Sequence, residues 1–232
     1  MIFSMPASSF QIDTRLAPPG HLTGQTPGTG IYPAQTDDLK RQILAALADS
    51  QCNGSIYLVG GSSGGCLALY VMLDSSTGAV TNWTEAARTS IKAVVSLSGP
   101  TRLCNWDNPG MVDSHTFEYG VCDYVGLTTI TQDCALLDPA SPYTIVSTAT
   151  SSPPVRLYTT VGDPVFSPQA GFMQSALLGK FGFTFDVKAY TMSYSGSSPY
   201  LHAFHYWHAQ NDAVTPNVCV SSQVIAFLQS YP

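Results

Sequence analysis

One uncharged stretch, Ser50 to Leu73, restricts the fold of this chain more than any other part of the sequence. It contains an apolar run from Ser55 to Val59, then Gly60-Gly61-Ser62-Ser63-Gly64-Gly65, and finally an Ala- and Leu-rich run. Six small, flexible residues at the centre would weaken a transmembrane helix of this length. The pattern instead predicts a buried strand, a tight turn and a buried helix, and no membrane span.

The remainder of the chain alternates apolar segments of strand and helix type. The predicted strands are Phe10–Asp13, Ser55–Val59, Ile91–Leu97, Val155–Val161 and Phe185–Met192. The predicted helices are Gln35–Leu47, Gly64–Leu73, Pro168–Leu178 and Pro216–Leu228, the last with Thr215 as its cap. Alternation of this kind is typical of an α/β fold, in which helices cover both faces of a mostly parallel sheet. Residues 101–153 lack clear periodicity, and we interpret them as a cap-like insertion within a single domain, residues 1–232.

The composition excludes several classes of protein. Charged residues make up only 10% of the chain and the formal net charge is −6, which argues against a disordered charged tail and against a nucleic-acid partner. Three of the six cysteines, Cys104, Cys122 and Cys134, lie close together in the sequence. A disulfide in that segment and three buried thiols are equally consistent with this spacing. No signal peptide is visible, and the compartment stays open between cytoplasm and secretion.

The turn after the second predicted strand matches G-x-S-x-G, which between a strand and a helix is typical of a nucleophile elbow. Small flanking residues let the strand and helix approach, and the positive end of the helix favours a developing negative charge. Two frames fit the pattern, with either Ser62 or Ser63 as the nucleophile. The spacing mildly favours Ser62.

Three segments together resemble the hormone-sensitive-lipase-like and acetyl-esterase-like α/β-hydrolases. The run from Gly60 to Ala68 resembles the family's GDSAGGNLA elbow, and Ile12 to Pro18 resembles its VDYRLAP segment. Tyr32-Pro33-Ala34-Gln35, with two aspartates shortly after it, resembles the FPAxLxD helix start. The resemblance implies the α/β-hydrolase fold, assigns the nucleophile to Ser62, and makes the backbone N–H of Ser63 an oxyanion donor.

A nucleophilic serine needs a base and an orienting acid, which follow it in the order Asp, His in this fold. His202, His205 and His208 all follow the last predicted strand. His202 stands in a segment that resembles the family's HGF or HAF motif, so we choose it as the base, with His205 the stronger substitute and His208 the weaker. Asp163 follows the preceding strand in a loop that resembles GxxDxLVxPQ, and it is the predicted acid.

The spacing His202-x-x-His205-x-x-His208 also raises the question of a metal site. Residues at i, i+3 and i+6 diverge around a helix, so we predict no metal site there. The resemblance to serine esterases implies no cofactor. Aromatic residues of the insertion are candidates to line an apolar substrate pocket, although ordinary packing explains them equally well. They are Trp106, Phe117, Tyr119 and Tyr124.

The family's HGGG-type loop, which supplies the second oxyanion donor, has no counterpart in this sequence. By the resemblance, that loop and the strand leading into it would precede residue 1, so we expect the first strands of the fold to be missing. Backbone groups of the loop from Ala17 to Gly30, or a second subunit in a homodimer, are then the candidates to replace the donor.

The resemblance implies a carboxylesterase, a serine hydrolase that acts on small-molecule, short-chain acyl esters through a Ser-Asp-His triad and an acyl-enzyme. Two alternatives remain open. One is a truncated or catalytically impaired hydrolase-fold protein that only binds its ligand. The other is an amidase or formamidase with the same triad.

Overall fold

In the part of the chain that the structure describes, the core of the fold is a four-stranded parallel sheet in which strands adjacent in sequence are adjacent in space. The computed structural model describes residues 30–104, 114–129, 131–160, 163, 167–192, 202–208 and 219–232. The sheet order is β1 (Ile56–Gly61), β2 (Ile91–Leu97), β3 (Val155–Thr160) and β4 (Val187–Met192). All four strands therefore end at the same edge of the sheet.

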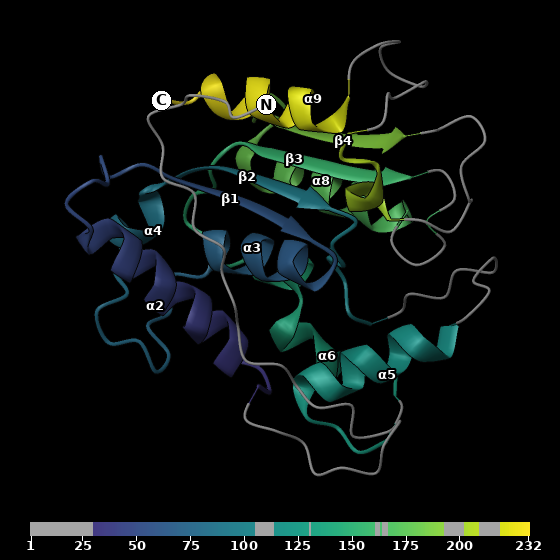
Figure 1. Cartoon of the computed structure of the whole chain (residues 1–232). Coiled ribbons are helices and arrows are strands. Elements are labelled where there is room, and N and C mark those ends of the chain that lie inside the picture. The colour runs from purple at the N-terminus through teal and green to yellow at the C-terminus, as the bar shows by residue number, and fades with distance from the viewer. Residues whose placement is uncertain are drawn as a thin grey trace.

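Helices cover both faces of this sheet (Figure 1). On one face lie α2 (Ala34–Ala48), α3 (Ser63–Leu73) and α8 (Ser167–Phe181), and on the other lies α9 (Val220–Gln229). Side chains along β2 alternate between these layers. Val94 packs with the α2, α3 and α8 side, whereas Val95 and Leu97 pack with α9. Strand β2, which lies inside the sheet, is buried on both faces, as expected of a parallel sheet.

Short helices fill the connections. The short helix α4 (Glu85–Thr89) precedes β2, and η2 (Ala203–Tyr206) follows β4 in the chain. Between β2 and β3 the chain forms α5, α6, η1 and α7, spanning Ser114–Val125, Cys134–Leu137, Asp138–Ala140 and Pro142–Ile145. Residues of this insertion make a separate small core around Leu103, Val121 and Leu137.

The four strands predicted from Ser55 onward are present: β2 has the predicted bounds, and the ends of the other three differ by at most two residues. The predicted strand Phe10–Asp13 lies outside the described residues. Helix α9 begins at Val220, four residues later than predicted, because Cys219 before it has an extended backbone (φ −82°, ψ 160°). Thr215 and Pro216 are also outside the described residues. The insertion contains more helix than its weak periodicity predicts, since packing around Leu137 and Val121 stabilises it.

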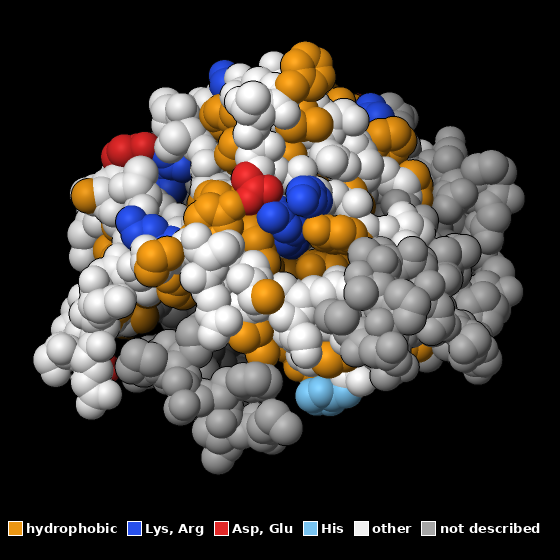
Figure 2. Space-filling model, turned by 90° about the horizontal axis from the view of Figure 1, so that it is seen from above, with side chains coloured by type: hydrophobic (Ala, Val, Ile, Leu, Met, Phe, Trp, Pro, Cys, Tyr) orange, Lys and Arg blue, Asp and Glu red, His pale blue; other side chains and the backbone are white. Residues whose placement is uncertain are grey.

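The surface seen from the α9 side carries hydrophobic side chains dispersed among polar ones, and few charged side chains (Figure 2). Dispersed apolar side chains are normal on a soluble surface and do not by themselves mark an interface. Within the described ranges, no helix combines the length and the apolar character needed to cross a bilayer.

Candidate active site

The carboxyl ends of the parallel strands gather three side chains of interest at one edge of the sheet. Ser62 directly follows β1, Ser98 directly follows β2, and Asp163 comes three residues after β3. The pairing of Gly61 with Leu97 places Ser62 level with Ser98 on the neighbouring strand. This edge is where ligands bind in open α/β sheets.

Ser62 has a strained backbone at the turn between β1 and α3. Its φ of 51° and ψ of −123° lie in a region that costs a non-glycine residue roughly 1–3 kcal/mol. Two sets of hydrogen bonds hold it there. Its N–H donates to Leu97 O (2.9 Å), and its carbonyl accepts from Gly65 N and Cys66 N (2.9 and 3.2 Å). Strand β2 and helix α3 therefore fix this serine at the helix N-terminus.

The glycines around the turn are required by close approach. A Cβ on Gly60 would lie 2.3 Å from the backbone of Gly64. A Cβ on Gly65 would lie 2.5 Å from Ser96 Oγ, and one on Gly99 would lie 2.3 Å from the same atom. The strand, the helix and the loop after β2 can meet only because these positions lack side chains.

His202 and Asp163 form a hydrogen-bonded pair beside this turn. Nδ1 of His202 lies 3.1 Å from Oδ2 of Asp163, whose side chain is 0% exposed, whereas that of His202 is 26% exposed. In the neutral tautomer with the proton on Nδ1, the ring donates to this carboxylate, which only accepts hydrogen bonds, and Nε2 is then the acceptor atom of the ring. A histidine in this state can remove a proton from a hydroxyl group.

The segment that carries His202 lies against the elbow. The ring of Phe204 packs over Gly61, where a Cβ would come within 3.0 Å of it. The described residues show no hydrogen bond between His202 and Ser62. Catalytic hydrogen bonds of apo enzymes are often long and tighten only when substrate is bound.

The two substitute histidines lie near the same segment but more exposed. The ring of His205 stacks 6.0 Å from that of His202, and both His205 and His208 are exposed. The carboxylate of Asp163 pairs with His202.

The structure describes the side chains of two of the four predicted pocket residues, Tyr119 and Tyr124. Trp106 lies outside the described residues, Phe117 lies on α5 without a described side chain, and Tyr119 is half-buried on the same helix. Tyr124 packs edge-on against Tyr32 with ring centroids 5.9 Å apart. Burial holds the pKa of its hydroxyl well above the usual value. Tyr124 therefore contributes to packing between the insertion and the start of α2.

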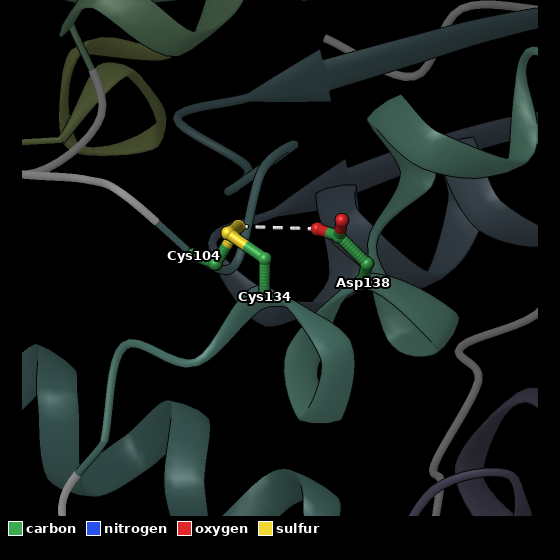
Figure 3. A group of neighbouring side chains, drawn as sticks. All are labelled: Cys104, Cys134 and Asp138. Atoms are coloured by element: carbon green, nitrogen blue, oxygen red, sulfur yellow. Dashed lines mark hydrogen bonds between the residues drawn. A yellow bond between two sulfur atoms is a disulfide. The ribbon is translucent and has the colours of Figure 1, made fainter.

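One cluster outside this edge has the ligand types of a metal site. Cys104, Cys134 and Asp138 place their ligand atoms within 4.8 Å of one another, and Asp138 Oδ1 lies 3.1 Å from Cys104 Sγ (Figure 3). The two cysteines form a disulfide. Metals bind thiolates, so the cluster has no sulfur ligand while this bond is intact. Of the two possibilities left by the cysteine spacing, the structure has the disulfide.

The sequence patterns did not mark Ser98 as a residue of the candidate site. Ser98 is buried and has a φ of 56°. Its hydroxyl accepts a hydrogen bond from Ala203 N (2.7 Å), directly beside His202. The only signal in the sequence is its place in a Ser-Gly-Pro turn after a buried strand.

Comparison with known families decides the relationship. The model of the BD-FAE family matches residues 25–178, which is more than half of the chain. This chain belongs to the BD-FAE family. No curated protein sequence matches this BD-FAE family member.

Solved structures share the fold at low sequence identity. A truncated carbohydrate esterase from gut microbiota is 16% identical, with a TM-score of 0.56 over 70% of this chain and 60% of that one. Esterase B from Lactobacillus rhamnosis HN001 is 16% identical, with a TM-score of 0.57 over 85% of this chain and 59% of that one. This chain therefore spans about 60% of the length of either protein. The predicted α/β-hydrolase fold is confirmed.

Proposed function

We propose that this BD-FAE family member is a carboxylesterase that hydrolyses short-chain acyl esters of small molecules through an acyl-enzyme on Ser62. The observation that carries the proposal is the strained Ser62 at the N-terminus of α3, at the sheet edge that also holds the His202–Asp163 pair. The names of the structural neighbours, a carbohydrate esterase and an esterase, support the same class of reaction.

In the proposed first half-reaction, Ser62 Oγ attacks the acyl carbon while Nε2 of His202 accepts the hydroxyl proton. The ring is then an imidazolium, which the buried carboxylate of Asp163 orients and stabilises. The carbon–oxygen bond to the alcohol breaks, and the alcohol leaves with the proton from Nε2. In the second half-reaction, water attacks the acyl-enzyme with the same proton transfers, which releases the acid and regenerates Ser62.

The N–H of Ser63 is the proposed oxyanion donor. Ser63 is the first residue of α3, and an N–H at this position has no partner within the helix. It lies at the positive end of the helix dipole, next to the nucleophile. A donor in this position stabilises the tetrahedral intermediate more than the ester.

The first experiment compares hydrolysis of 4-nitrophenyl acetate by the wild type and by Ser62→Ala. Loss of the nucleophile should lower kcat by at least about 10⁴-fold. Ser90→Ala is the matched control, because Ser90 is a buried serine at the opposite end of β2. A fluorophosphonate should label Ser62, and mapping of the labelled peptide separates it from Ser63. Turnover that survives in Ser62→Ala, or a label on Ser63, would contradict the proposal.

The same assay defines the substrate class. We expect turnover to fall from 4-nitrophenyl acetate and butyrate to long acyl chains, and a matched 4-nitroanilide to react far more slowly. Faster turnover of the anilide would indicate an amidase instead.

A further inference from the structure

Ser98 and Ser62 are the two non-glycine residues with a positive φ in the described part of the chain, and they end neighbouring strands. Strain of this kind is concentrated at functional sites, where surrounding structure maintains it. Glycine would adopt a φ of 56° without strain. A serine at this strained position therefore points to a role for its hydroxyl.

The hydroxyl of Ser98 has a defined partner. Its Oγ accepts a hydrogen bond from Ala203 N at 2.7 Å, and both residues are 0% exposed. Ala203 begins η2, so its N–H lacks a partner within that short helix. A buried N–H without a partner is costly, and Ser98 supplies the partner across 105 residues of sequence.

Ser98 is itself held rigidly. Its N–H donates to Tyr158 O (2.7 Å) on β3, and it continues β2 directly. A Cβ on the next residue, Gly99, would lie 2.8 Å from the backbone of Gly65 in α3. The hydroxyl is therefore fixed relative to both the sheet and the helix that carries the elbow.

The segment from His202 to Phe204 is anchored at three points. The His202 ring bonds to Asp163, the peptide between His202 and Ala203 bonds to Ser98, and the Phe204 ring packs on Gly61. The contact with Asp163 sets the ring orientation, but it does not fix the backbone that carries the ring. The hydrogen bond that the Ala203 N–H donates to Ser98 Oγ fixes that backbone.

We propose that Ser98 is a positioning residue for the general base: its hydroxyl holds the His202–Ala203 peptide so that Nε2 faces Ser62. The inference rests on the proposed function of Ser62 and His202. Ser98 does not touch the substrate or transfer a proton. It acts through the placement of His202.

Ser98→Gly is the decisive variant, because it removes the hydroxyl and also relieves the backbone strain. We expect kcat for 4-nitrophenyl acetate to fall by about 10- to 100-fold, the loss that follows a displacement of a catalytic group. KM should stay close to that of the wild type, since Ser98 makes no contact with the ester. Thermal unfolding should be changed little or shifted upward. Ser98→Ala keeps the strain and should lose both activity and stability.

Ser90→Ala is the matched control. Ser90 also has a buried hydroxyl bonded to backbone, donating to Ala87 O (2.6 Å), but at the opposite end of β2. Its loss should lower the unfolding temperature and leave kcat unchanged. An equal fall of kcat in Ser90→Ala would show that loss of a buried serine hydroxyl at either end of β2 affects turnover, and would overturn the specific role of Ser98.

Hydrogen exchange of the Ala203 amide tests the contact without any need for turnover. The exchange rate should rise about tenfold or more in Ser98→Gly, because the amide loses its acceptor. Unchanged exchange, or faster exchange with wild-type kcat, would overturn the proposal. Ester turnover no greater in the wild type than in Ser62→Ala would instead overturn the proposed function, and the positioning role with it.

Discussion

At the scale of single residues, the elbow turn depends far more on Gly60 than on Gly64. A Cβ on Gly60 would lie 2.3 Å from the carbonyl carbon and oxygen of Gly64, both backbone atoms that cannot move aside. A Cβ on Gly64 would meet nothing within 4 Å. The strand must therefore pass directly beneath the first turn of α3 to place Ser62 at the helix end.

We predict that Gly60→Ala lowers the free energy of unfolding by about 3 kcal/mol, the upper end of the usual cost of overpacking. Gly64→Ala should leave it unchanged or raise it by up to roughly 1 kcal/mol, since alanine favours helix. Urea unfolding of both variants measures the difference. Equal urea midpoints for the two variants would contradict this prediction, because they would mean that β1 and α3 can move apart to accept a Cβ at position 60.

At the scale of elements, a buried ion pair joins α2 to the end of α3. Lys40 Nζ lies 2.7 Å from Oδ2 of Asp74, and the two side chains are 2% and 8% exposed. The same ammonium group donates to Ser76 O at 2.9 Å. The next residue, Arg41, pairs with Asp38 at 3.1 Å, but its side chain is 46% exposed. Two adjacent residues of one helix therefore form ion pairs in different environments.

Lys40→Met should lower the free energy of unfolding by about 3–5 kcal/mol, because it leaves a buried carboxylate without its partner. Arg41→Met should change it by less than about 1 kcal/mol, since solvent screens the exposed pair. Guanidinium unfolding of both variants is the measurement. Addition of Asp74→Asn to Lys40→Met should recover part of the lost free energy of unfolding. A double variant that is less stable than Lys40→Met would contradict the coupling of the two charges.

At the scale of the whole molecule, a disulfide links two parts of the insertion between β2 and β3. Cys104 and Cys134 are 30 residues apart, and the ring that they close contains the whole of α5. Residues on both sides of the bond, including Leu103 and Leu137, belong to the small core of the insertion. The bond therefore restricts the unfolded insertion and links two segments of its small core.

Removal of this disulfide in Cys104→Ser/Cys134→Ser should lower the free energy of unfolding by about 2–4 kcal/mol. The thermal unfolding temperature of the wild type should fall to that of the variant when dithiothreitol is added. The variant itself should not respond to the reductant, which controls for effects on the other cysteines. An unfolding temperature of the wild type that is independent of reductant would contradict a stabilising role.

The local elements follow from rules that act within a few residues, and the sequence alone predicted them well. Buried strands such as Ile91–Leu97 are recognisable because a mostly apolar segment suits a sheet covered on both faces. The Gly/Ser turn predicted the strained elbow, since its glycines fit only where strand and helix meet closely. The α/β fold class followed from the order of these elements.

Contacts between distant segments were decided by the tertiary structure. The hydrogen bond between Asp163 and His202 was expected from the resemblance, but only the parallel sheet brings the loop after β3 close to the segment after β4. The bond from Ala203 to Ser98 spans 105 residues and leaves no periodic signal, so no sequence rule indicated it. Apolar patterns specify which residues are buried, whereas the strand order specifies which strand ends lie side by side. The candidate site is formed by contacts between the segments that follow those strand ends.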